Sequence, residues 1–110
     1  MLEIREYTDE LGRSRYADWI SQFDDGTQAR IAIGLRRVGT GNFSNVKSVG
    51  SGVFELKLNF GPGFRVYIGR EADHLILLLG GGTKSRQGAD IERAKASWRA
   101  YKQRKRAGEL

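Results

Sequence analysis

GVFELKLNFGPGFRVYIG, residues 52–69, carries the clearest structural pattern in this chain. Apolar side chains occupy every second position from Phe54 to Phe60 and again from Phe64 to Ile68, which is the period of a strand with one buried face. The run Gly61-Pro-Gly63 separates the two and is typical of a turn. The stretch therefore predicts two consecutive antiparallel strands.

The positions between these apolar residues carry charged side chains. Alternation places Lys57 and Arg65 on the faces opposite their apolar neighbours, and pairing across the turn brings the two close. An ordinary solvent-facing sheet shows the same residue types. The pattern alone therefore favours an exposed sheet face over a site.

Further strands are predicted on both sides of this pair. Residues 75–79, LILLL, are apolar on both faces and predict a central strand that completes an antiparallel meander. Leu2 and Ile4 alternate with charged residues and predict a short N-terminal strand. Residues 39–52 predict a loop with at most one short strand. We expect one α+β domain over residues 1–110, with the order strand, helix, helix, strands, helix.

Two helices are predicted between the first strand and the meander. The first follows a cap at Thr8 or Asp9, and the second follows a cap at Asp25 or Thr27 and stops at Gly39. Together they predict an antiparallel helical hairpin. Their apolar stripes are Tyr16, Trp19, Ile20 and Phe23 in the first helix, and Ile31, Leu35 and Val38 in the second.

The net charge of +6 comes from one C-terminal segment. Residues 1–83 hold equal numbers of basic and acidic side chains, whereas residues 84–106 hold nine basic and two acidic ones. This segment predicts a helix capped by Asp90 that ends near Gly108. Its apolar stripe is Ile91, Ala94, Trp98 and Tyr101, and a basic stripe beside it consists of Lys95, Arg99, Lys102 and Arg106.

The basic stripe points to an anionic partner. A charge run is usually a solvated face, but this local excess beside a neutral remainder is larger than solubility requires. Nucleic acid is favoured over acidic protein and over a membrane surface. Trp98 and Tyr101 fit a core role better than a base-stacking role.

Composition excludes several kinds of site. With no cysteine the chain has no disulfide and no thiolate nucleophile, and it suits a reducing compartment, so we expect it in the cytoplasm. No apolar run is long enough to cross a bilayer, and the N-terminus has no signal-peptide pattern. A membrane partner is therefore not expected.

Nucleotide, metal and histidine sites are not favoured either. Gly80-Gly-Gly82 followed by Thr83 and Lys84 lacks the spacing of a nucleotide-binding loop, and a tight exit from a buried strand explains the glycines. His74 is the single histidine and lies beside a predicted turn. Chemistry in this chain must rest on Arg, Lys, Tyr, Glu and backbone groups.

Residues 52–69, the following LLLGGGTKSRQ of residues 77–87 and DIERAKA of residues 90–96 resemble a known family. They are similar to the addiction-module killer protein, or HigB-like, branch of the RelE/ParE toxin superfamily. The resemblance covers nearly the whole chain. It implies a small α+β toxin of a bacterial type II toxin-antitoxin pair, most often one that cuts mRNA in the ribosomal decoding site, with a helix-turn-helix antitoxin as partner and without a cofactor or metal.

The resemblance also implies roles for individual residues. Arg65 matches an arginine that contacts the scissile phosphate, and Lys84 lies where relatives often have a basic residue. Lys57 is a further candidate for the catalytic site, and Arg86 for phosphate contacts. Two other functions suit the same fold and charge: a toxin that binds DNA gyrase without chemistry, and a plain nucleic-acid-binding module.

Overall fold

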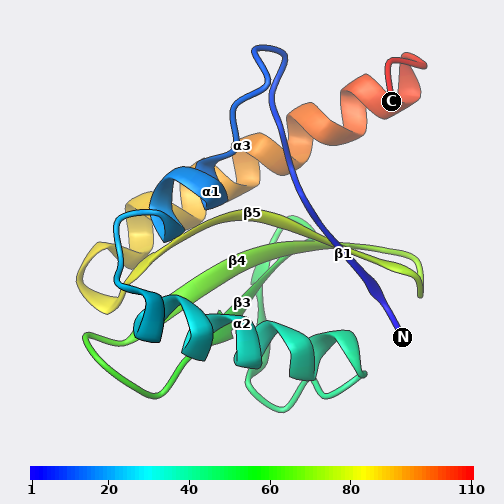
Figure 1. Cartoon of the computed structure of the whole chain (residues 1–110). Coiled ribbons are helices and arrows are strands. Elements are labelled where there is room, and N and C mark those ends of the chain that lie inside the picture. The colour runs from blue at the N-terminus through cyan, green and yellow to red at the C-terminus, as the bar shows by residue number, and fades with distance from the viewer.

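The computed structural model describes residues 1–110, which form a five-stranded sheet with helices on both faces (Figure 1). Strand order in the sheet is β1-β5-β4-β3-β2. The strands are β1 (Glu3–Glu6), β2 (Val46–Gly50), β3 (Val53–Lys57), β4 (Phe64–Glu71) and β5 (Leu75–Thr83). The helices are α1 (Arg15–Ile20), α2 (Asp25–Gly39) and α3 (Gln87–Arg106), with the 3-10 turn η1 (Lys84–Arg86) before α3. The α+β class is confirmed.

The predicted meander is present and is longer than expected. Strands β2 to β5 pair antiparallel in sequence order, so the 39–52 segment supplies a fourth strand. Strand β1 pairs with β5 in parallel, which makes the sheet mixed. The apolar run of β5 thus lies between β1 and β4, as a central strand does.

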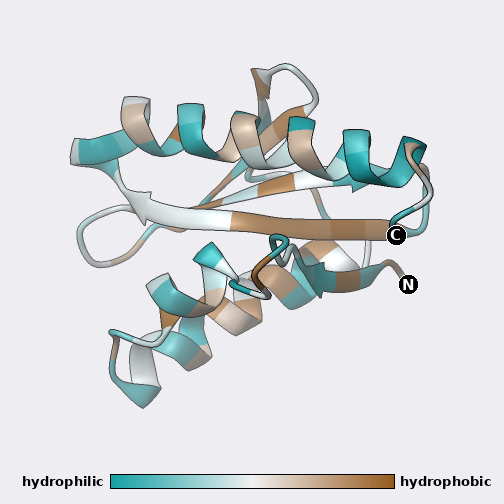
Figure 2. Cartoon of the chain, turned by 90° about the horizontal axis from the view of Figure 1, so that it is seen from above, coloured by the Kyte–Doolittle hydropathy of each residue, from teal (hydrophilic) through white to brown (hydrophobic).

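Helices cover both faces of the sheet (Figure 2). One core cluster joins α1 and α2 to the face formed by the apolar positions of the 52–69 stretch, including Leu56, Val66 and Ile68. A second cluster joins α3 to the opposite face, where Val53 and Tyr67 lie. The alternation was therefore assigned correctly. The prediction that the second face of the sheet is exposed to solvent was wrong, because α3 packs on that face.

The start of α1 differs from the prediction. Asp9 does not begin a helix, because its Oδ1 accepts hydrogen bonds from the amides of Leu11 at 2.9 Å and Arg13 at 3.0 Å and so closes a separate turn. Ser14 caps α1 instead, accepting from the amide of Ala17 at 3.0 Å. These same hydrogen bonds to Asp9 lower the pKa of its carboxyl.

Both ends of α2 lie one or two residues from the predicted caps. Asp24 is the N-cap and accepts from the amide of Thr27 at 2.7 Å. Gly41, at φ +97°, takes the left-handed position after the helix, a role the sequence assigned to Gly39. Gly39 serves packing instead, since a Cβ there would lie 3.2 Å from Cδ1 of Ile4.

The last helix begins before its predicted cap. Asp90 lies in the first turn of α3, and its carboxylate packs against Gly82 of β5 and bonds Nη1 of Arg93 at 3.1 Å. The predicted apolar stripe is largely correct, because Ala94, Trp98 and Tyr101 are buried on the sheet. None of the helices is both long and apolar enough to span a membrane.

Candidate nucleic-acid interface

The candidate site lies where β3 ends, β4 begins and β5 leads into η1. Lys57 and Arg65 are direct partners across β3 and β4, as predicted. Arg65 also pairs with Gly82 of β5, so Lys84 follows close behind it in space. A Cβ on Gly63 would lie 2.9 Å from Nη1 of Arg65 and 3.4 Å from Cβ of Lys84. The fold therefore gathers Arg65 and Lys84 around the β3–β4 turn.

Arg65 is buried at the centre of this site, with 5% of its surface exposed. Its Nη1 donates to the carbonyl of Gly63 at 2.7 Å, and its Nε lies 3.5 Å from Oε1 of Glu55. No protein group accepts a hydrogen bond from Nη2. The guanidinium is thus held by one hydrogen bond and one ion pair, although Nε and Oε1 of Glu55 make no hydrogen bond, and Nη2 is left for a ligand.

Glu55 is the carboxylate that fixes this arrangement, and it is completely buried. Nε2 of Gln87, the first residue of α3, donates to its Oε2 at 2.6 Å. Nζ of Lys47 on β2 lies 3.9 Å from its Oε1. One side chain therefore connects β2, β3, β4 and α3.

The sequence prediction missed Glu55, Gln87 and Lys47 as site residues. A signal for Glu55 was present, because an acid in the middle of an apolar strand shares the face of Lys57 and requires a buried partner. Gln87 had no such signal, since 32 positions separate it from Glu55. Only the packing of α3 on the sheet joins them.

Tyr67 extends this buried polar group along β4. Its side chain is fully buried, and its hydroxyl has no hydrogen-bond partner. Burial raises the pKa of the Tyr67 phenol, and the negative charges of Glu55 and Asp90 raise it further. The phenol therefore stays protonated at neutral pH. No group of three or more His, Asp or Glu side chains is arranged to hold a metal ion.

Exposed cations surround the buried pair. Lys84 and Arg86 lie in η1, are exposed and form no ion pair. Arg86 is also the N-cap of α3 and makes no side-chain cap hydrogen bond, and the positive end of the dipole of this 20-residue helix lies here. This end of the molecule therefore carries positive charge.

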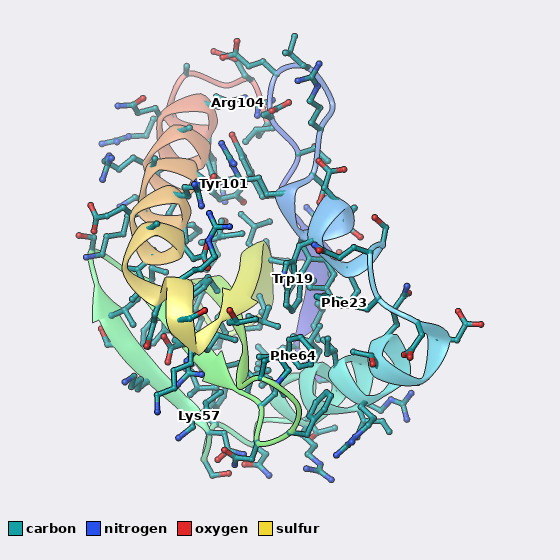
Figure 3. All side chains as sticks on the ribbon, turned by 90° about the vertical axis from the view of Figure 1, so that its left-hand side faces the viewer. Trp19, Phe23, Lys57, Phe64, Tyr101 and Arg104 are labelled. Atoms are coloured by element: carbon teal, nitrogen blue, oxygen red, sulfur yellow. The ribbon has the colours of Figure 1, made fainter.

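The Lys57 side chain shares the sheet face of Arg65, its direct cross-strand partner, and is exposed. The residue also lies at the edge of a groove lined by Arg30 and Arg37 of α2. Figure 3 shows Lys57 outside the aromatic group of Trp19, Phe23 and Phe64, whose rings lie 5.1 to 6.1 Å apart between centroids. The structure therefore places all three predicted catalytic residues at this end of the sheet.

The basic stripe on α3 is shorter than the sequence pattern. Arg99, Lys102 and Arg106 are exposed and have no acidic partner, whereas Nζ of Lys95 lies 3.7 Å from Oε2 of Glu92 and its side chain is largely buried. We call the three exposed cations the α3 stripe. Because the helix rises about 1.5 Å per residue, the stripe extends from the middle of α3 to its end, away from Arg65.

The aromatic residues beside the stripe are core residues, as predicted. Trp98 is buried against the sheet and stacks on Tyr101, with ring centroids 5.5 Å apart. Nζ of Lys102 lies 5.7 Å above the Trp98 ring. Two neighbouring cations have structural partners: Arg104 donates to the carbonyl of Thr8 at 2.9 Å, and Lys105 pairs with Glu71.

Replacing Arg99, Lys102 and Arg106 together with Gln is expected to weaken binding to single-stranded RNA without regard to sequence. The slope of log Kd plotted against log salt concentration should decrease by about 0.7 for each lost phosphate contact, or by about 2 for all three. Melting temperature should change little, because exposed substitutions shift stability by less than about 0.5 kcal/mol each.

Fluorescence anisotropy over a salt series measures this effect. The control variant replaces Arg13, Arg15 and Arg36 together with Gln. It removes the same amount of charge from other exposed positions. Equal salt slopes in the two triple variants would mean that the α3 stripe is only a solvated face.

Comparison with known proteins identifies a related sequence. No family model matches the chain. An uncharacterized protein of Haemophilus influenzae is 40% identical to it over 81 residues, which span 73% of this chain and 82% of that protein.

Proposed function

The chain belongs to one family with the uncharacterized Haemophilus influenzae protein, and we propose that it is the toxin of a bacterial type II toxin-antitoxin pair. In this proposal it cuts mRNA on the ribosome without a metal ion, and a helix-turn-helix protein neutralises it. The observation that carries the proposal is the site where β3 ends and β4 begins, which we call the strand-end site. There a fixed Arg65 lies among exposed cations.

This arrangement suits transfer of a phosphodiester within RNA. The 2′ oxygen forms a bond to phosphorus while the bond from phosphorus to the 5′ oxygen breaks. The 2′ hydroxyl loses a proton and the 5′ oxygen gains one, which leaves a 2′,3′-cyclic phosphate and a 5′ hydroxyl. Negative charge on the phosphate oxygens is stabilised by donors that are already in place.

Each site residue has a role in this scheme. Arg65 holds the scissile phosphate through Nη2, because Nη1 donates to the Gly63 carbonyl and Nε faces the Glu55 carboxylate in an ion pair. Lys84 is exposed beside it and supplies positive charge and a proton for the 5′ oxygen. Arg86 and the first amides of α3 bind neighbouring phosphates. Glu55 and Gln87 position the arginine.

A binding toxin without chemistry is the second candidate, and the α3 stripe favours it. The three cations of that stripe extend away from Arg65, so they suit a partner surface larger than one phosphodiester. Such a toxin poisons its target, for example DNA gyrase, by contact alone. The two candidates differ in what happens to mRNA.

Induced expression of the chain is expected to arrest bacterial growth, with protein synthesis falling first. Sequencing of RNA ends should reveal new 5′-hydroxyl ends inside translated frames, and co-expression of the adjacently encoded antitoxin should restore growth. Lys84→Gln should relieve toxicity, whereas Arg36→Gln, an exposed charge on α2 outside the site, should not.

The same experiment separates the alternatives. Arrest with intact transcripts and induced DNA-damage response would support gyrase poisoning. Normal growth at high expression of the folded protein would contradict a toxin of either kind.

A further inference from the structure

A second basic surface lies on the opposite side of the sheet from α3. It is a groove of about 420 Å³ between α2 and the end of β3, which we call the α2 groove. Arg30 and Arg37 of α2 line one wall, and residues 56–60 at the end of β3 line the other. No acidic side chain lines it, and neither arginine forms an ion pair.

The sequence hides this groove because residues 1–83 are neutral in total. Folding separates the charges: Glu55 is buried, while Arg30 and Arg37 stay exposed. Two positive charges face one space without compensation. Such an arrangement raises the local concentration of an anion.

The positions of the two arginines suit an extended polyanion. They are seven residues apart, about two turns or 10 Å along α2. The guanidinium of Arg30 lies 4.0 Å from the ring centroid of Phe60, a cation–π contact that holds it at the groove wall. Several phosphates in a row match this spacing better than one small anion does.

Side-chain amides lie between the cations. Asn42, Asn45 and Asn59 all line the groove. Oδ1 of Asn42 accepts from the amide and hydroxyl of Ser44 at 3.1 and 2.8 Å, which leaves its nitrogen free to donate. Amides pair with the mixed donors and acceptors on unpaired base edges, whereas carboxylates of an acidic peptide offer acceptors only.

We propose that the α2 groove binds a single-stranded RNA segment, its phosphates held by Arg30 and Arg37 and its bases contacted by the asparagine amides. The choice of RNA rests on the proposed function. Residues 56–60 form one wall of the groove and include Lys57, whose side chain shares the sheet face of Arg65. RNA that extends from the scissile phosphate past the end of β3 enters the α2 groove.

The test uses the full chain and a 2′-O-methyl uridine hexamer, which has no 2′ hydroxyl and so is not cleaved. In nitrogen-15 NMR spectra, the side-chain amide signals of Asn42, Asn45 and Asn59 are expected to shift on addition of the hexamer. By anisotropy at low salt, the double variant Arg30→Gln/Arg37→Gln should bind it about tenfold more weakly, with a salt slope lower by about 1.4.

Arg13→Gln/Arg36→Gln is the matched control, because Arg36 is adjacent to Arg37 on α2 but does not line the groove. Equal weakening in both double variants, or asparagine signals that do not move, would overturn the inference. A glutamate hexapeptide that moves those signals at lower concentration than the RNA would also overturn it, in favour of an acidic protein segment.

These outcomes are independent of cleavage. Hexamer binding in the groove together with intact mRNA in cells would contradict the nuclease and leave the groove assignment standing. Cleaved mRNA in cells, together with no binding of the hexamer in the groove, would support the nuclease and contradict the groove assignment.

Discussion

Arg65→Lys is expected to slow mRNA cleavage on programmed ribosomes by about 10²- to 10³-fold, the cost of removing one fixed donor to a charged transition state. Lysine keeps the positive charge beside Glu55, which preserves the buried ion pair. It cannot donate to the Gly63 carbonyl and to a phosphate at once with the planar geometry of a guanidinium. The readout is the single-turnover rate of the purified variant.

Arg36→Lys is the control for this substitution, because Arg36 is exposed on α2 away from the strand-end site. Thermal melting checks that both variants fold. Cleavage by a folded Arg65→Lys protein at the rate of the parent would remove Arg65 from the site. Arg65→Ala is a poorer test, because it leaves the buried Glu55 carboxylate without its cation.

Glu55→Gln is expected to reduce the free energy of unfolding by about 3 to 5 kcal/mol, the cost of removing one partner from a buried ion pair. Glu55 is fully buried and Arg65 is 5% exposed, so the remaining guanidinium charge has little solvent to stabilise it. Urea unfolding followed by tryptophan fluorescence measures the change, since Trp98 and Trp19 lie in the two core clusters.

Glu3→Gln provides the control for charge loss, because Glu3 is exposed and pairs only with Arg5 at 2.6 Å. Exposed pairs of this kind contribute less than about 1 kcal/mol. Adding Arg65→Met to Glu55→Gln should recover much of the lost stability, since the unpaired buried charge is then gone. A loss below about 1 kcal/mol for Glu55→Gln alone would show that the pair does not support the fold.

The two predictions separate positioning from chemistry in one site. Glu55 contacts Arg65 and Gln87 but is completely buried, so it acts through these neighbours and not on a ligand. Its loss should change stability first. Arg65 keeps Nη2 free of protein partners, so a conservative change there should alter rate with the fold intact.

Much of the fold was predictable from local patterns. Alternation in residues 52–69 placed Phe64 and Val66 on one face and Arg65 and Tyr67 on the other, and the turn at residues 61–63 fixed the pairing of Lys57 with Arg65. These features depend on neighbours in sequence, where a period of two leaves one solution. Helical spacing likewise predicted burial of Trp98 and Tyr101.

The helix caps were predicted less well. Asp9, Asp24, Asp25 and Thr27 can all accept backbone hydrogen bonds, and their side chains do not differ enough to rank them. Asp9 was used in a turn and Asp24 in the cap because of the path the chain takes from β1 to α2. Local chemistry allowed several helix starts, and tertiary packing selected among them.

By itself, the sequence determined the α+β class, the meander, the buried faces of the helices and the basic character of α3. Only the tertiary structure decided that α3 covers the second sheet face, which buries Arg65 with Glu55 and adds Gln87. It also placed Arg30 and Arg37 along one groove that no acidic side chain lines. The physical reason is range: periodicity reports which face of one element is apolar, whereas burial and electrostatic pairing depend on which elements meet.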